Sequence, residues 1–254
     1  MPVRKARPGP RVLTAALCAT LAVVGYMTVS PEDSATAPGP RPAAKNAGPG
    51  AAPRPATPEA PPGVGPVTRT RIPDVASQAL VVTGKTRDTN VADAVLYERD
   101  GTGKWQRAAG PWPAHNALRG WTNDHWAGDL RTPIGVFRIG DAGGRLPNPG
   151  TLLPYDHDKE FVSPGTGFLG EPLEGSFDYV VAIDYNRIPG TTPLNKKRPL
   201  GAERGGGVWV HVDHGGPTQA CVSLSADAMR QLLRALKPAR EPVIVMGPAA
   251  EIAQ

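Results

Sequence analysis

Residues 205–237 read GGGVWVHVDHGGPTQACVSLSADAMRQLLRALK, which places a strand, a glycine-rich turn and a helix in succession. The run Val208–Val212 is β-branched and aromatic, so it predicts a strand, and turn residues follow it directly. Ser225 is a suitable N-cap, and the apolar residues after it recur at the spacing of one helix face: Met229, Leu232, Leu233 and Leu236. We expect a helix over residues 225–237 that packs this face into a core.

Short apolar segments separated by turn residues occur along most of the chain. They are rich in β-branched residues and bounded by Gly, Pro, Asn and Asp, which is typical of strands. Five further strands are expected on this basis: Ala79–Thr83, Ala94–Tyr97, Gly135–Ile139, Tyr179–Tyr185 and Val243–Met246. The pattern predicts a mostly β fold, a sandwich or barrel with one or two helices. Residues 140–172 are rich in Gly and Pro and predict long loops.

Charge is unevenly distributed along the 254 residues. Residues 1–71 contain nine Lys and Arg against three Asp and Glu, whereas the remainder contains 19 against 20. The net charge of +5 therefore comes from the N-terminal extension. Because no basic stripe with interleaved aromatic residues occurs in the rest of the chain, we expect no nucleic acid as a partner.

The N-terminus has the pattern of an export signal. Four basic residues precede 18 positions without a charge, from Val12 to Val29. This run is long for a cleaved signal and just long enough to span a bilayer. Ala35-Thr36-Ala37 is an acceptable cleavage site, so we interpret residues 1–37 as a signal peptide or a membrane anchor. In both cases this segment enters the membrane, and the rest of the chain is exported to the cell wall or periplasm, either secreted or membrane-anchored.

A linker and a single folded domain are expected after this segment. Residues 31–66 contain eleven prolines and almost no large apolar residue, so they cannot bury a core. We therefore predict a disordered Pro/Ala-rich linker over residues 38–71. The folded catalytic domain is expected over residues 72–248.

Cys221 is the only cysteine outside the N-terminal apolar segment, which holds Cys18. An unpaired thiol in an oxidising compartment is a liability unless it reacts for a purpose or pairs between chains. His211 lies ten residues earlier, and a strand followed by a tight turn can bring its imidazole to the thiol. This pair favours a thiol nucleophile activated by a histidine base. The alternative is a buried, inert cysteine beside an unrelated histidine.

Neighbours of this pair are candidates for supporting roles. Backbone N–H groups around Ala220, and the positive end of the following helix, would stabilise an oxyanion and a thiolate. Gly216 allows the turn to approach a substrate closely. Asp213 or a backbone carbonyl would orient His211. A further supporting candidate is Gln219, and candidate substrate contacts are His214 and Tyr155. No residues have the spacing of a metal site, so we expect no metal.

Three stretches of the chain resemble the YkuD-type L,D-transpeptidases, and together they span roughly residues 79–247. The family's catalytic His and its T/S-x-G-C turn resemble His211-Val-Asp and Thr218-Gln-Ala-Cys221-Val-Ser. The family's strand G-D…T-P-x-G-x-F-x-I resembles Gly128-Asp-Leu-Arg-Thr-Pro-Ile-Gly-Val-Phe-Arg-Ile139. The strand before its catalytic loop resembles Tyr179-Val-Val-Ala-Ile-Asp-Tyr-Asn186.

The resemblance implies a mostly β cysteine enzyme that acts on peptidoglycan stem peptides and helps to build the cell wall. Cys221 would take an acyl group from a tetrapeptide, release its terminal D-alanine and pass the acyl group to an amine on a neighbouring stem. By motif position, His211 is the base and the N–H groups of Ala220 and Cys221 form the oxyanion hole. No metal or organic cofactor is implied, and we expect a monomer.

The chain departs from the commoner family pattern in two ways. The usual H-G-C turn reads Gln219-Ala220-Cys221 here, and the spacing between His211 and Cys221 is shorter than usual. These differences indicate a divergent branch and leave the acceptor open. Two alternatives remain: a thiol hydrolase of the L,D-carboxypeptidase type, and a catalytically silent domain that binds the cell wall.

Overall fold

The computed structural model describes residues 59–254, so the predicted signal or anchor and most of the predicted linker lie outside the described residues. The helices in this part of the chain are α1 (Pro66–Arg69), α2 (Ala226–Ala235) and α3 (Ala249–Ile252). Two short 3-10 turns lie at Ala202–Arg204 and Pro238–Arg240. The strands are β1 (Gln78–Gly84), β2 (Val91–Arg99), β3 (Trp105–His115), β4 (Trp121–Thr122), β5 (Thr132–Pro133), β6 (Gly135–Arg138), β7 (Asp141–Gly144), β8 (Tyr155–His157), β9 (Val180–Ala182), β10 (Trp209–Val212), β11 (Val222–Leu224) and β12 (Val243–Pro248).

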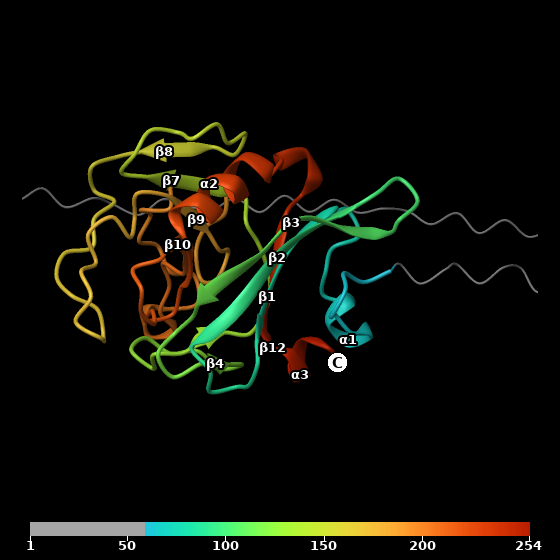
Figure 1. The fold of residues 1–254 in the computed structure, drawn as a ribbon, viewed down its shortest axis with the longest axis horizontal. Helices are drawn as coiled ribbons and strands as arrows, with labels where there is room; N and C mark the ends of the chain where they lie inside the picture. The colour runs from blue at the N-terminus through green and yellow to red at the C-terminus, as the bar shows by residue number, and fades with distance from the viewer. Residues whose placement is uncertain (1–58) are drawn as a thin grey trace, which may run out of the picture. The chain divides into compact units, whose positions relative to one another are not determined.

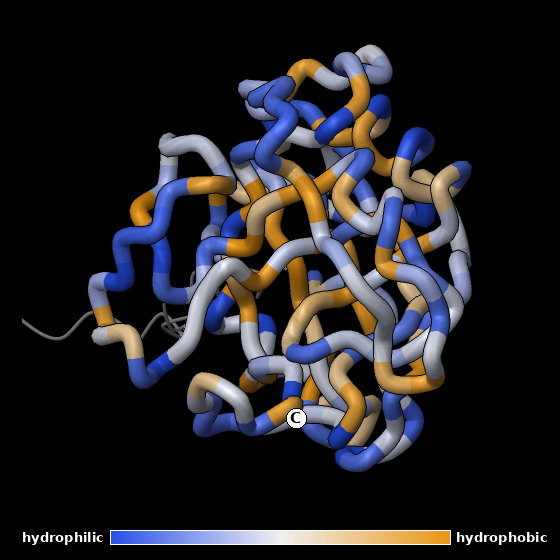
Figure 2. The backbone as a smooth tube through the Cα atoms, turned by 90° about the vertical axis from the view of Figure 1, so that its left-hand side faces the viewer, coloured by the Kyte–Doolittle hydropathy of each residue, from blue (hydrophilic) through white to orange (hydrophobic). Residues whose placement is uncertain are grey.

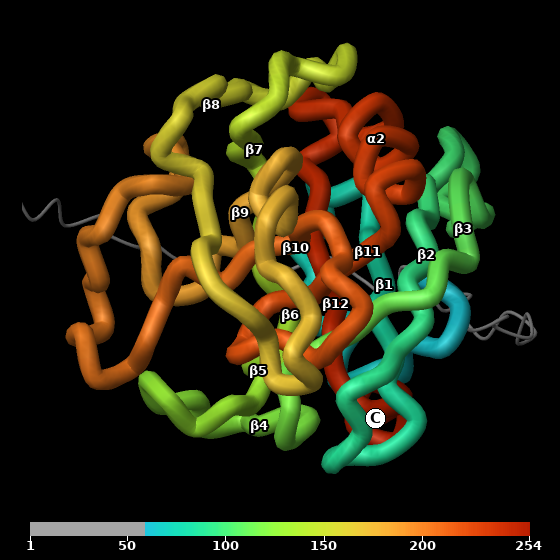
Figure 3. The backbone as a smooth tube through the Cα atoms, turned by 60° about the vertical axis from the view of Figure 1, so that its left-hand side comes forward, coloured from blue at the N-terminus to red at the C-terminus, as the bar shows by residue number. Residues whose placement is uncertain are grey.

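Ten of these strands form one mixed sheet in the order β6-β12-β1-β2-β3-β11-β10-β9-β7-β8, and β4 pairs with β5 separately (Figure 1). β1 is parallel to β12 and antiparallel to β2, while β10 is parallel to β11 and antiparallel to β9. The central strands β9, β10 and β11 run side by side (Figure 3). The predicted mostly β fold is confirmed, and α2 is the one described helix longer than four residues.

The main hydrophobic core joins the two halves of this sheet. Leu80 from β1 and Ile244 from β12 share it with Val181 from β9 and Val210 from β10. Because side chains from opposite halves meet in one core, the sheet bends over on itself and encloses its apolar face. Accordingly, the apolar stretches of the backbone run through the middle of the domain in Figure 2, and hydrophilic segments surround them.

Helix α2 closes this core and agrees with its prediction. Ser225 is its N-cap and accepts a hydrogen bond from the Ala228 N–H at 3.2 Å. The predicted apolar stripe is fully buried, at 0% exposure for Met229, Leu232, Leu233 and Leu236. The helix therefore forms because its sequence supplies both the cap and the buried face.

A second hydrophobic cluster covers the opposite face of β1 and β12. Val81 and Val245 point into it, and Val64, Ile72 and Ile252 pack against them. The segment before β1 and the C-terminal helix α3 thus complete the fold. The predicted linker boundary at residue 71 is wrong, because the residues from 59 onward pack on the sheet, and the predicted domain end at residue 248 is too early.

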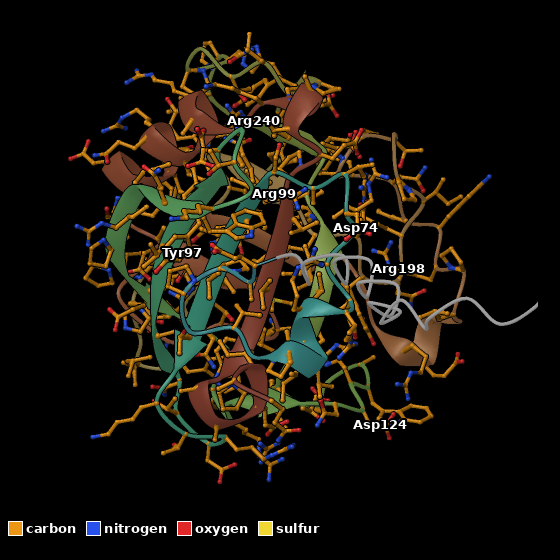
Figure 4. The ribbon with its side chains drawn as sticks, turned by 90° about the vertical axis from the view of Figure 1, so that its right-hand side faces the viewer. Asp74, Tyr97, Arg99, Asp124, Arg198 and Arg240 are labelled. Carbon is orange, nitrogen blue, oxygen red and sulfur yellow. The ribbon has the colours of Figure 1, made fainter. Side chains whose placement is uncertain are left out.

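Arg69 anchors this N-terminal segment from a buried position. Its guanidinium donates to the carbonyls of Glu59 at 3.1 Å and Ile72 at 2.9 Å, and it pairs with Asp74 at 2.9 Å. Arg99 of β2 in turn donates to the Asp74 carbonyl; these two residues lie on the side of the molecule that faces the viewer in Figure 4. The segment is thus fixed by hydrogen bonds as well as by apolar contacts.

A chain that begins at Ile72 should be less stable than one that begins at Glu59. The shorter chain loses the burial of Val64 and Arg69 and exposes the cluster beneath them, at a cost of about 2–4 kcal/mol. Urea unfolding midpoints of the two chains measure this difference. Equal midpoints would show that residues 59–71 do not contribute to the fold.

Strand β3 is the longest strand and was not predicted. Its interior contains Gly110, Pro111 and Pro113, which in sequence indicate a break. Prolines are accommodated because β3 pairs with β11 only through Ala114 and His115, so most of that edge has no strand partner in the part of the chain that the structure describes. The predicted strand over Tyr179–Tyr185 is in turn reduced to β9. Within residues 59–254, no helix is long and apolar enough to cross a membrane.

Candidate active site

β10 and β11 place the two predicted catalytic residues on one face of the sheet. Val210 lies opposite Val222, and His211 lies opposite Ser223. Side chains alternate along strands, so the two valines enter the core while His211 and Cys221 point to the other face. Cys221 directly precedes β11 and lies diagonally across from His211, at a Cα separation of roughly 8 Å by strand geometry.

The thiol of Cys221 is free and held by backbone groups. The Trp209 N–H donates to Sγ at 3.4 Å, and the thiol donates to the Gly207 carbonyl at 3.7 Å. Burial raises the thiol pKa to about 11, against the smaller opposing effect of the Trp209 N–H, so the resting group is a neutral thiol. Because β11 and Ser225 separate Cys221 from the first turn of α2 along the chain, stabilisation of the thiolate by the positive end of this helix stays a prediction.

His211 is a buried, neutral imidazole. Its Nδ1 lies 2.8 Å from the Val212 carbonyl, which can only accept, so Nδ1 carries the proton and Nε2 is left with a lone pair. The ring contacts Phe177 edge-on, with centroids 5.4 Å apart. Burial lowers its pKa to about 4, although the Val212 hydrogen bond acts in the opposite direction. Of the two predicted orienting groups, the backbone carbonyl is confirmed.

Asp213 does not orient His211, so this alternative is wrong. Its Oδ1 accepts from the Ser223 hydroxyl at 2.6 Å and lies 2.7 Å from His115 Nδ1, while Oδ2 accepts from the Gly215 N–H at 3.2 Å. His115 comes from the end of β3, which the sequence could not place here because it lies 98 positions away. The carboxylate therefore fixes the turn after β10 to the neighbouring strands.

One cavity of about 470 Å³ contains the thiol, His211 and the turn between them. Its wall includes the exposed Gln219 and the half-buried Ala220 and Cys221, and the N–H groups of these three residues have no hydrogen-bond partner within residues 59–254. Three adjacent donors beside a nucleophilic atom are the elements of an oxyanion hole. The predicted supporting residues Ala220 and Gln219 thus line the cavity.

Ala220 is compatible with this turn. Within the described residues, positive φ values outside glycine occur only at Leu130, Asn186 and Glu241, so Ala220 has an ordinary backbone. Replacing Ala220 with Gly should therefore leave the acylation rate nearly unchanged and cost up to ~1 kcal/mol through added chain entropy. Thermal melts and acylation rates check this, and a clear gain in both would mean that the alanine is strained.

His214 lines the cavity, and Gly216 makes room for the carboxylate that holds His214. The ring of His214 stacks on His211 with centroids 5.8 Å apart, and its Nδ1 lies 3.1 Å from Glu171 Oε1. Gly216 leaves room for that carboxylate, since a Cβ there would lie 2.0 Å from Glu171 Oε1. Glu171 was not predicted, because it lies in the Gly/Pro-rich loop region with no motif around it.

Tyr155 does not belong to this site. It lies on β8, donates to the Leu146 carbonyl at 2.8 Å and is absent from the cavity wall. The cavity wall instead includes His125, which is buried, with Nδ1 3.0 Å from Asp129 Oδ1. Burial lowers the pKa of His125 despite this carboxylate. Within residues 59–254, no three His, Cys, Asp or Glu side chains are grouped as metal ligands.

The burial of His211 predicts an acid-dependent loss of stability. A histidine whose pKa falls from 6.5 to about 4 on folding stabilises the folded state above pH 6.5, and this contribution is lost as the pH falls toward 4. The loss by pH 4 should be about 3 kcal/mol. The variant His211→Gln should lack this dependence, as measured by urea unfolding at both pH values. Parallel pH profiles of the two proteins would contradict the assignment.

Comparisons with known proteins give no further guide to this site. No protein-family model, no curated protein and no solved structure matches the chain.

Proposed function

We propose that the protein is an exported L,D-transpeptidase that transfers acyl groups between peptidoglycan stem peptides through a thioester on Cys221. The single observation that carries this is the cavity shared by Cys221, His211 and a turn with three N–H groups that have no hydrogen-bond partner within residues 59–254. A nucleophile, a base and oxyanion donors are what acyl transfer requires. The resemblance to the YkuD-type family supplies the substrate class.

The first half-reaction begins from a neutral pair. The thiol hydrogen turns from the Gly207 carbonyl toward His211, which takes the proton on Nε2 as Sγ attacks the peptide carbonyl carbon. Catalytic hydrogen bonds often tighten only when substrate is bound, which accounts for the absence of a direct Cys221–His211 bond here. The free N–H groups stabilise the oxyanion, and His211 returns the proton to the leaving D-alanine amine.

Product analysis tests this proposal against its alternatives. The protein is incubated with a stem tetrapeptide, with and without an acceptor amine. D-Alanine release with formation of a new amide supports the transpeptidase. D-Alanine release with hydrolysis alone, even when acceptor is present, indicates a carboxypeptidase. No turnover in either reaction would refute an enzyme and favour the silent wall-binding domain.

A further inference from the structure

A second imidazole stands beside His211 and differs from it in its partner. The rings of His211 and His214 are nearly parallel, 12° apart, and both line the cysteine cavity. His211 is bound to a backbone carbonyl, whereas His214 is bound to the carboxylate of Glu171. The side chains of His214 and Glu171 are only 6% and 12% exposed, so this pair is sheltered from solvent, and His214 lines the cavity.

The loop that carries Glu171 is built to hold its carboxylate there. Thr166 and Pro172 form an isolated β-bridge that closes the loop, and Leu169 donates its N–H to Glu171 Oε2 at 2.7 Å. Partial burial raises the pKa of Glu171, but hydrogen bonds from its own backbone, from Leu169 and from His214 outweigh that effect and lower it. An ionised carboxylate only accepts, so His214 carries a proton on Nδ1, and Nε2 is the ring nitrogen that faces no partner from Glu171.

Because His211 is bound to a carbonyl and His214 to a carboxylate, the two imidazoles are suited to different steps of proton transfer. Within residues 59–254, no carboxylate is hydrogen-bonded to the buried His211 ring, and Asp213 acts on it only from a distance, whereas Glu171 contacts His214 directly. An amine acceptor of the lysine type has an ordinary pKa of about 10.4 and arrives as an ammonium ion. Its proton must be taken by a group with a counter-ion for the positive charge, and in the cavity wall His214 has such a counter-ion in Glu171.

We propose that the Glu171–His214 pair is the acceptor site, where His214 takes a proton from the ammonium group of a primary-amine acceptor. This inference rests on the proposed function. The neutral amine then attacks the thioester carbonyl carbon, so that a C–N bond forms and the C–S bond breaks. The second amine proton passes through His211 to the departing Cys221 thiolate, and His214 releases its proton to water.

The test separates the two half-reactions in the wild type and in Glu171→Gln and His214→Gln. Thioester formation from a stem tetrapeptide is followed by intact mass. Its resolution is then timed with two acceptors: Nα-acetyl-lysine, which is protonated at neutral pH, and hydroxylamine, which is not. Glu174→Gln removes an exposed carboxylate from the same loop region and serves as the matched control.

We expect both variants to resolve the thioester ~10²-fold more slowly than the wild type with the lysine acceptor. With hydroxylamine their rates should stay within about threefold of the wild type. The control should match the wild type with both acceptors. A merely structural role would slow both acceptors alike, and this result overturns the inference, as does an unchanged lysine rate. With either of these two results, thioester formation by the wild type would still support the proposed function. If the wild type forms no thioester, the proposed function fails, and the inference fails with it.

Discussion

Replacing Cys221 with serine should abolish D-alanine release while leaving the fold intact. The exchange alters one atom of the only described thiol. A hydroxyl is a poorer nucleophile, and one buried imidazole whose pKa lies near 4 is a weak base for it. Loss of a covalent nucleophile costs on the order of 10⁴–10⁶-fold in rate, so turnover should fall below detection.

Thermal melts of wild type and Cys221→Ser distinguish a lost nucleophile from a lost fold. Both proteins should melt within about 2 °C of one another, because the serine hydroxyl can accept from Trp209 and donate to Gly207 as the thiol does. A serine variant that retains activity near the wild-type rate would sink the assignment of Cys221 as nucleophile.

Replacing His211 with alanine should lower the acylation rate by ~10²–10⁴-fold, which is the usual contribution of general acid–base catalysis. His157 provides a control, since it is exposed on β8, and within residues 59–254 the one hydrogen-bond partner of its ring is the Arg145 carbonyl. His157→Ala should retain the wild-type rate. Equal rates for His211→Ala and wild type would show that His211 is structural, and His214 would become the candidate base.

The sequence alone suggests that His211→Ala also raises the thiol pKa by removing an imidazolium partner. The structure revises this expectation, because burial keeps His211 neutral and Cys221 protonated at neutral pH. No resting ion pair exists to be removed. Iodoacetamide reactivity measured against pH should therefore give a thiol pKa near 11 in both proteins. A thiol pKa that differs clearly between the two proteins would instead support a resting ion pair between Cys221 and His211.

The parts of the fold that the sequence predicts are those encoded by local patterns. The cap and stripe of α2 and most of the apolar strands depend on residues close in sequence. Strand β3 was missed because its prolines are acceptable only at an edge that the sheet order creates. The domain start was misplaced for a related reason: Val81 and Val245 face away from the main core, and only the structure shows that residues 59–72 cover them.

The site residues likewise fall into those that local sequence predicts and those that only the structure brings together. His211 and Cys221 are ten residues apart around one turn, so local reasoning brings them together. Glu171 contacts His214 from 43 positions away and His115 contacts Asp213 from 98 positions away, and no local signal marks either of them. Such contacts depend on how the loop around residues 166–172 folds back on the turn after β10, which no local sequence pattern encodes.

The intact mass of the protein after incubation with a stem tetrapeptide tests the central claim most directly. The account predicts a covalent adduct of the peptide minus its terminal D-alanine, located on Cys221 by peptide mapping and absent from Cys221→Ser. An unmodified protein at every time point, with a Cys221 thiol that still reacts with iodoacetamide at high pH, would contradict the account.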